Sequence, residues 1–454
     1  MKLIFSIEYK TAWGEEVVLC LDGKRIGLEY VADGLWQGEV SHTALKESLE
    51  YGYEIVREGV TVRKEWGRHV LPKGLSAKTV NVNDRWQDRP VDAPFFSSAF
   101  TKGIFGRGKS SYVSQTDKNN VLFQVAAPAL RPNEVLAFAG STKAFGKWSH
   151  VIPFDDSDFP VWTLPIEVTE PFMYKLVIAD KETLKPIAWE DGENRVFGFL
   201  PLKDEFFVEA SVQPRFSGRQ WRGAGTAIPV FSLRSEDDFG VGEFLDLKKM
   251  VDWAAETGQS ILQLLPINDT TMTGTWEDSY PYNANSTFAL HPQFINLPAA
   301  GVPVTKAYKE MQAELNALDQ IDYEKVNNTK LELLRKAYDK TFAKLSASKA
   351  YKAFIAANEE WLMPYAAFCV LRDMNGTPDF SKWKTNKKYN AKKIAAFCEE
   401  NRMEVDFWCF IQYHLDAQLS EVCSYAHSKG VVLKGDLPIG ISRTSVDAWL
   451  YPEL

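Results

Sequence analysis

The pattern of apolar and polar residues gives the chain two different textures. Up to about residue 210, short stretches alternate apolar and polar positions, as in residues 122–126 and 173–178. Pro, Gly, Asn and Asp separate these stretches. A period of two is typical of strands that bury one face, and frequent turn residues favour antiparallel sandwiches. This part of the chain is therefore predicted to be all-β.

An internal repeat divides the β-rich part. Residues 51–56, Tyr-Gly-Tyr-Glu-Ile-Val, match residues 172–177, Phe-Met-Tyr-Lys-Leu-Val, at an offset of 121. Three further matches lie at offsets of 118 to 126, and one of them pairs Trp66 with Trp189. Repeats of this length mark copies of one structural unit. We therefore predict two tandem antiparallel β-sandwiches and a linker, at residues 1–110, 111–212 and 213–223.

From residue 224 onwards the pattern becomes that of an α/β domain. Residues 226–231 are a strand candidate, and apolar residues then recur at helical spacing from Phe244 to Ala254 before Gly258. Residues 261–266, Ile-Leu-Gln-Leu-Leu-Pro, are mostly apolar without alternation, which is typical of a parallel strand buried on both faces. These segments predict a βαβ unit with a right-handed crossover.

A second helix and strand follow a long helical stretch. Residues 404–428 carry an apolar stripe that ends near Gly430, and residues 431–436 form the third strand candidate. The intervening residues, from about 305 to 400, are rich in Lys, Glu and Ala and predict a helical insertion. Three parallel strands leave an open sheet edge, so we expect the α/β domain to continue beyond Leu454.

Composition narrows the classes of function. The net charge of −8 argues against nucleic acid as a partner, because counterion release requires an excess of Lys and Arg. Five cysteines without CxxC spacing indicate neither a disulfide framework nor a metal site. The N-terminus has no apolar leader and no stretch is long enough to cross a membrane, so we expect a cytoplasmic protein. Aromatic residues make up 13%, which favours flat surfaces for a ligand.

Three motifs in the second repeat resemble the starch-binding domains of carbohydrate-binding module family 20. They are Phe145-Gly146-Lys147-Trp148, Tyr174-Lys175, and the run from Trp189 to Arg195. The apolar face of a glucose ring packs well on an indole, and polar side chains bind its hydroxyl rim. The resemblance implies a platform of Trp148 and Trp189, with polar contacts from Lys175, Glu190 and Asn194. Burial of both tryptophans in the sandwich core is the alternative.

The first repeat departs from this pattern. It has no Trp where Trp148 stands, and Glu54 replaces Lys175. Trp66 is a further sugar-binding candidate in this repeat, and a structural role is its alternative.

Motifs after the strands of the α/β part resemble the 4-α-glucanotransferases of glycoside hydrolase family 77, the amylomaltases or disproportionating enzymes. The motifs are Phe239-Gly240-Val241-Gly242, the run Asp278 to Ser286, Gly435-Asp436-Leu437-Pro438, and Ser445 to Trp449. The domain order is closest to that of the plant cytosolic members. The resemblance implies that residues 224–454 form the first part of a (β/α)8 TIM barrel, whose active site lies at the carboxyl ends of the strands.

The resemblance also implies roles for individual residues. Asp436 matches an aspartate of the donor subsite, and Tyr282 matches a substrate-contacting tyrosine. Ser279, Asp447 and Trp449 are further substrate-binding candidates. The family's nucleophile, acid and stabilising Asp follow later strands, and no residue of this chain matches them. We therefore expect the chain to be the N-terminal portion of the enzyme, inactive alone, and no cofactor is implied.

The leading hypothesis is a retaining 4-α-glucanotransferase that moves glucosyl units, from maltose or maltodextrin, to starch or glycogen. A glycan-binding protein without catalysis is the alternative, because no catalytic carboxylate is identified. A hydrolase of the α-amylase type is disfavoured, because Leu437 and Pro438 follow Asp436 where that family has an Asn-His pair. The sequence does not indicate an oligomeric state.

Overall fold

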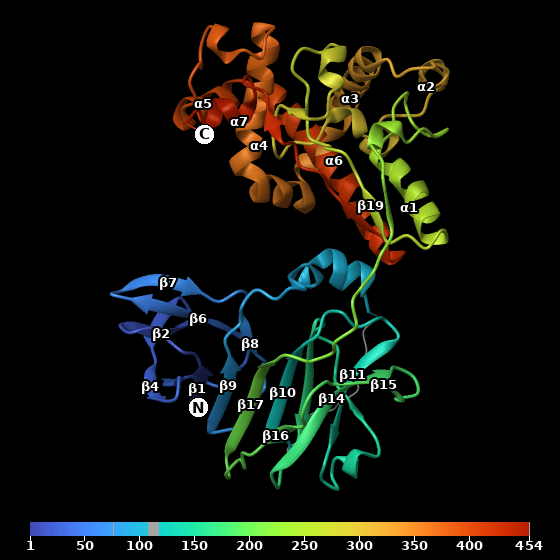
Figure 1. Cartoon of the computed structure of the whole chain (residues 1–454). Coiled ribbons are helices and arrows are strands. Elements are labelled where there is room, and N and C mark those ends of the chain that lie inside the picture. The colour runs from blue at the N-terminus through green and yellow to red at the C-terminus, as the bar shows by residue number, and fades with distance from the viewer. Residues whose placement is uncertain (76, 108–117, 454) are drawn as a thin grey trace. The chain divides into compact units, whose positions relative to one another are not determined.

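The computed structural model describes residues 1–75, 77–107 and 118–453, and the chain divides into two compact units (Figure 1). The first unit is Met1–Arg222 and the second is Gly223–Leu454, so the division lies inside the predicted linker. The predicted boundary between the two sandwiches, at residues 110 and 111, lies outside the described residues.

One large sheet runs through the whole first unit. Among the described residues it has seven strands, of which β9, β17 and β10 can be seen side by side in Figure 1. In spatial order they are β13 (Val161–Ile166), β10 (Val121–Ala126), β17 (Glu205–Val212), β9 (Thr79–Arg85), β1 (Lys2–Glu8), β5 (Leu35–Ser41) and β4 (Glu29–Ala32).

Two smaller sheets complete the layers of the first unit. One consists of β12 (Ile152–Pro153), β11 (Glu134–Gly140), β14 (Phe172–Asp180) and β15 (Pro186–Trp189), with β16 (Arg195–Phe197) also paired to β14. The other consists of β3 (Lys24–Gly27), β2 (Glu15–Leu21), β6 (Leu49–Arg57) and β7 (Val60–Lys64), with β8 (His69–Leu71) paired to β6. Strands β6 and β14 are the two copies of the repeated segment.

The four central strands of the large sheet are parallel. Strand β1 pairs with β9, β9 with β17, and β17 with β10, each in parallel register. The prediction of two tandem, wholly antiparallel sandwiches is therefore wrong in this respect. The two repeats share one mixed sheet, because the last strand of each, β9 and β17, pairs across the boundary between them.

The shared sheet places the two hydrophobic cores on its opposite faces. Val82 and Val208 are register partners, and both lie in the first core, with Leu3 and Phe5. Phe123 of the neighbouring strand β10 lies in the second core. Side chains alternate between the faces of a strand, so each repeat fills the face that the other leaves open.

A buried histidine ties the first repeat to β17. The Nε2 atom of His69 lies 3.0 Å from a carboxylate oxygen of Glu65, and Nδ1 lies 3.1 Å from Asp84. The hydroxyl of Ser211, on β17, is 2.8 Å from the same Nδ1. Burial opposes the charged imidazolium, but Asp84 and Glu65 outweigh it and raise the pKa of His69 to about 10.

The second unit has a three-stranded parallel sheet, as predicted. Its strands are β18 (Gly225–Ala227), β19 (Ile261–Gln263) and β21 (Val432–Lys434), in that order among the described residues. The helix between β18 and β19 is α1 (Leu247–Glu256), and the helix that leads into β21 is α6 (Arg402–Ser428), which confirms both helix predictions. These elements give an α/β fold, while closure into a barrel stays a prediction.

The predicted insertion is helical. It contains α2 (Lys306–Asn316), α3 (Tyr323–Ser346), α4 (Lys349–Asn375) and α5 (Ala391–Glu400), and α7 (Val446–Leu450) follows the third strand. Lys330 of α3 is buried and donates to Glu243, at 2.6 Å, and to the carbonyl of Gln293. Glu243 precedes α1, so this buried pair fixes the insertion against the βαβ unit.

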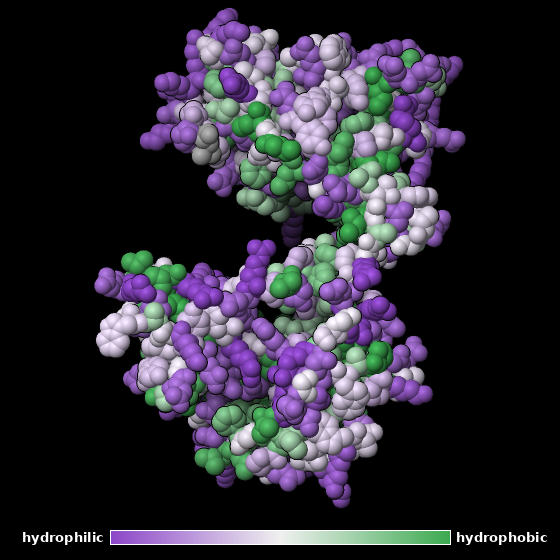
Figure 2. Space-filling view, in the orientation of Figure 1, coloured by the Kyte–Doolittle hydropathy of each residue, from purple (hydrophilic) through white to green (hydrophobic). Residues whose placement is uncertain are grey.

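The described residues contain no helix long and apolar enough to cross a membrane. The visible face in Figure 2 is largely hydrophilic or pale, with separate green patches on each unit. Tryptophan and tyrosine are pale on this scale, so aromatic surfaces that suit a sugar do not stand out by hydropathy.

The His69 network predicts a pH-dependent stability. Because the folded pKa of about 10 exceeds the unfolded value of 6.5, the contribution of His69 is complete below pH 6.5 and is lost as the pH rises towards 10. We expect the free energy of unfolding to fall over this range, as measured by urea denaturation at several pH values.

The substitution that tests this network is His69→Phe. His69 pairs with β6 in the first repeat, and the matching position in the second repeat, where β16 pairs with β14, is occupied by Phe197. The substitution leaves two buried carboxylates unpaired and should cost about 3 kcal/mol at pH 6. The difference from wild type should shrink towards pH 10, and His150→Gln, on an exposed histidine, is the control. A constant difference would contradict the network.

Candidate functional site

Two loops of the second repeat meet at Lys175 on β14. Gly140, at the end of β11, pairs with Tyr174, so the turn that carries Trp148 leaves the sheet there. On the other side of β14, Trp189 pairs with Val177, and the chain then passes Lys175 to enter β16. The sheet register therefore brings both predicted tryptophan loops to the same end of β14.

The two tryptophans differ in exposure. Trp189 is 43% exposed at the end of β15. Trp148 is half-buried and packs partly on the second core. It has a φ of +69°, and Lys147 before it has a φ of +49°. Two successive residues in the left-handed region indicate a turn that is held by its surroundings.

Polar contacts between loop and sheet fix the Trp189 loop. The Lys175 ammonium donates to the carbonyl oxygens of Glu190 and Gly192, at 2.8 and 2.6 Å. Asn194 is exposed, and its amide makes no hydrogen bond within the described part of the chain. Lys175 is therefore partly committed to the loop, whereas Asn194 is free to bind a ligand.

The prediction that Glu190 contacts the sugar is wrong. Glu190 is only 1% exposed, and its carboxylate accepts from Arg195, from Arg215 and from the backbone N–H of Leu176. Burial favours a raised pKa for Glu190, but Arg195 holds that pKa below its usual value. Glu190 is a charged anchor beneath the loop, and its side chain does not reach solvent.

The predicted correspondence between Trp66 and Trp189 also fails. Val177 is the partner of Trp189, and its counterpart in the repeat, Val56, pairs with Thr61. Trp66 lies beyond the end of β7, and its ring meets Phe96 edge-on at 5.4 Å. Bulges in both strands shift the register, and the constant offset in the sequence cannot reveal them.

In the second unit, the structure brings together two of the predicted substrate-binding residues. The Tyr282 hydroxyl donates to Asp436 at 3.1 Å, across 154 positions of sequence. Directly beyond them β20 (Asn283–Ala284) and β22 (Gly440–Ile441) pair in parallel and hold the two loops side by side. The hydrogen bond to Asp436 raises the pKa of Tyr282.

The loop before Tyr282 is organised by Asp278. Its carboxylate accepts from the backbone N–H groups of Met272, Thr273 and Gly274, at 2.7 to 3.1 Å. Ser279 follows directly and is half-buried. Asp278 thus shapes the turn, while Ser279 remains a predicted ligand.

The predicted residues of the last segment have different surroundings. Asp447 accepts from the N–H of Thr287 at 2.8 Å, and burial raises its pKa. Trp449 is 2% exposed, and its indole donates to the carbonyl of Asn386 while the ring packs near Trp383. The prediction that Trp449 contacts substrate is therefore wrong, because its ring is part of the core.

One buried network was missed by the sequence analysis. Asp269 is fully buried and accepts from the Tyr365 hydroxyl at 2.8 Å and from Asn285 at 3.3 Å. It connects the loop after β19 to α4 of the insertion. Its place six residues after the end of strand β19 was the available signal. Among the described residues, no group of three His, Cys, Asp or Glu side chains could hold a metal ion.

The position of Glu190 gives a prediction. Glu190→Ala leaves the guanidinium of Arg195 unpaired in a half-buried site and should lower the free energy of unfolding by about 3 kcal/mol, measured by urea denaturation. The folded variant should still bind glycogen, and exposed Glu193→Ala is the matched control. Unchanged stability with lost glycogen binding would restore Glu190 as a direct contact.

Comparisons with known proteins match the second repeat and the second unit to two different family models. The model of the 4-alpha-glucanotransferase family matches residues 228–454, and the starch binding domain model matches residues 118–200. The 4-alpha-glucanotransferase DPE2 of Oryza sativa subsp. japonica is 36% identical over 493 residues, covering 100% of this chain and 52% of the relative. The 4-alpha-glucanotransferase of Chlamydia caviae is 35% identical over 235 residues, covering 50% and 43%.

Among solved structures, amylomaltase from Streptococcus agalactiae in complex with acarbose is 24% identical and has a TM-score of 0.45. The match covers 52% of this chain and 47% of that one. The chain spans about half the length of the curated relatives it matches. Since the family model matches half of its residues, this chain belongs to the 4-alpha-glucanotransferase family.

Proposed function

We propose that this protein transfers α-1,4-linked glucosyl units from maltose or a short maltodextrin to starch or glycogen, with retention at the anomeric carbon. Membership of the family supports the reaction class. The observation that carries the proposal is the hydrogen bond between Tyr282 and Asp436, two predicted substrate contacts from distant segments. Their loops are joined by the β20–β22 pair, so they form one prearranged site.

The chemistry of this pair suits the donor sugar. The Asp436 carboxylate is partly exposed and can accept hydrogen bonds from sugar hydroxyls, which are strong because the acceptor is charged. Tyr282 occupies one acceptor position of that carboxylate and fixes its orientation. The phenol ring adds a flat apolar surface for a pyranose face. This arrangement binds and orients the donor.

The reaction itself needs two further carboxylates. Retention needs a nucleophile and an acid about 5 Å apart on either side of the glycosidic bond, and no residue of this chain is given either role. Transfer requires the acceptor hydroxyl to outcompete water, and a bound acceptor at high local concentration favours it. The second repeat supplies that acceptor, through a face built from Trp148, Trp189 and Asn194.

We also retain two expectations from the sequence. The first repeat, residues 1–110, and the second, residues 111–212, are two starch-binding modules, followed by a barrel portion at 224–454. The protein is cytoplasmic, and five free cysteines, three of them buried, support a reducing environment. A non-catalytic glycan-binding role is the second candidate, since the sugar-binding face needs no catalytic residue.

The sugar-binding face predicts a loss of glycogen binding in Trp148→Ala/Trp189→Ala. Each stacked ring contributes about 1 kcal/mol, so the dissociation constant for glycogen should rise roughly 30-fold. Affinity electrophoresis in glycogen gels measures this shift. Trp13→Ala removes a fully exposed indole at another turn and is the control. Equal retardation of wild type and the double variant would show that Trp148 and Trp189 do not bind glycogen.

The donor site predicts weaker maltose binding in Tyr282→Phe, because Asp436 loses the hydroxyl that orients it. The dissociation constant for maltose should rise roughly tenfold, as measured by NMR titration. Tyr425→Phe is the matched control, since it removes a comparable hydrogen bond to Asp252, on α1. If both variants bind maltose like wild type, the pair does not contact the donor.

A further inference from the structure

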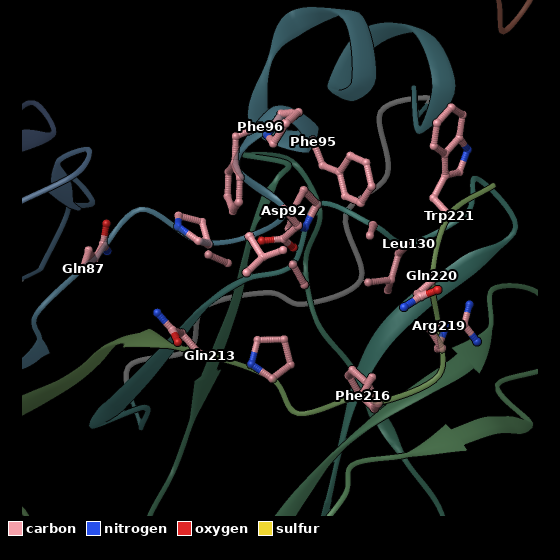
Figure 3. A pocket seen from close by; sticks show the side chains of 18 of the residues that line it. Gln87, Asp92, Phe95, Phe96, Leu130, Gln213, Phe216, Arg219, Gln220 and Trp221 are labelled. Carbon is pink, nitrogen blue, oxygen red and sulfur yellow. The ribbon is translucent and has the colours of Figure 1, made fainter. Parts of the chain in front are cut away.

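A cavity of about 560 Å³ lies in the first unit, at the seam between the two repeats (Figure 3). Its walls come from the segments that follow β9, β10 and β17. Because these three strands are parallel neighbours, their carboxyl ends lie at the same edge of the sheet. The cavity is therefore a product of the β9–β17 pairing, and neither repeat could form it alone.

Aromatic rings line much of this cavity. In Figure 3, Phe95, Phe96 and Trp221 lie along one side and Phe216 lies opposite. Trp66 joins this wall through its edge-on contact with Phe96. Prolines in each of the three segments restrict the backbone, so the rings are held in place before any ligand binds.

The polar side chains of the cavity fall into two groups. Gln87 and Arg219 are committed to the fold, since Gln87 donates to Ser211 at 2.8 Å and Arg219 pairs with Glu134 at 2.5 Å. The side chains of Asp92, Gln213 and Gln220 make no hydrogen bond or ion pair within the described residues. Asp92 lies between the two aromatic sides in Figure 3.

This combination selects the chemistry of the ligand. A carboxylate and two amides can hydrogen-bond hydroxyl groups, but they offer no free cation to a phosphate or carboxylate ligand. Binding of a pure hydrocarbon would remove water from the Asp92 carboxylate and offer no hydrogen bond in its place. A neutral molecule with apolar ring faces and a hydroxyl rim satisfies both the rings and the free polar groups, and that description fits a sugar.

We infer that the seam cavity is a second binding site for a short α-1,4-glucan, separate from the Trp148/Trp189 face. The identity of the glucan rests on the proposed function, because the adjoining repeat matches the starch binding domain model. The sugar character of the ligand rests on the cavity itself. In this account Trp66 binds sugar as a wall of the cavity and not as the counterpart of Trp189.

The test uses maltotriose and the full chain. In the Trp148→Ala/Trp189→Ala/Tyr282→Phe background, which weakens both proposed glucan sites outside the cavity, maltotriose should still bind, as measured by isothermal titration calorimetry. Adding Ala129→Trp, which places a large side chain in the cavity wall, should weaken that binding by at least about tenfold. Asp92→Ala/Gln213→Ala keeps the cavity open, removes its free polar groups and should have a similar effect.

Controls separate the possible outcomes. Melting temperatures check that each variant folds, and Trp13→Ala should bind like wild type. If maltotriose binding disappears in the Trp148→Ala/Trp189→Ala/Tyr282→Phe background, the sites outside the cavity account for all binding and the cavity inference is overturned. If maltotriose binding is lost only in the cavity variants, the inference stands and the Trp148/Trp189 face does not bind maltotriose. Binding that none of the cavity variants changes, or binding of 8-anilinonaphthalene-1-sulfonate that maltotriose cannot displace, overturns the inference.

Discussion

The parallel pairing of β9 with β17 is the constraint on which the first unit depends. It joins two repeats into one sheet and sends their hydrophobic cores to opposite faces. The same pairing aligns the carboxyl ends of three strands, so the segments that leave them meet at one edge. His69 reinforces the junction, because it joins two carboxylates of the first repeat to Ser211 on β17. The proposed seam cavity therefore depends on both repeats, whereas the proposed Trp148/Trp189 face lies on the sheet of the second repeat.

Buried charges serve the fold, while exposed or half-exposed side chains remain for a ligand. Glu190, His69 and Lys330 are each enclosed and fully paired, and each fixes a loop or an insertion against a sheet or helix. Removing one partner of such a pair costs far more than the pair itself contributes, so these groups are poorly suited to a changing ligand. Asn194 lies in the loop that Glu190 anchors. Asp436 contacts Tyr282 in the loop that Asp278 shapes. Asn194 and Asp436 are therefore proposed as hydrogen-bonding groups for a sugar.

The sequence was most informative where one periodicity extends over many residues. The apolar stripe of residues 404–428 identified α6, and the mostly apolar run at 261–266 identified the parallel strand β19, of which Leu262 is buried. It could not reveal the β9–β17 pairing, because strands 126 residues apart carry ordinary alternation and nothing local marks their partner. Motif resemblance placed Tyr282 and Asp436, which the structure joins by a hydrogen bond. It could not distinguish an exposed side chain from a buried one, so Trp449 was misassigned.

The central proposal is that this chain binds α-glucan and orients the donor sugar, together with the expectation from the sequence that it holds neither the nucleophile nor the acid. One measurement addresses both halves: incubation of the 454-residue chain with maltose and glycogen, followed by assay of free glucose and of chain retained on glycogen. The account predicts retention on glycogen with no glucose above the level without protein. Glucose released in proportion to the amount of chain would contradict it, because a nucleophile and an acid would then have to lie among these residues.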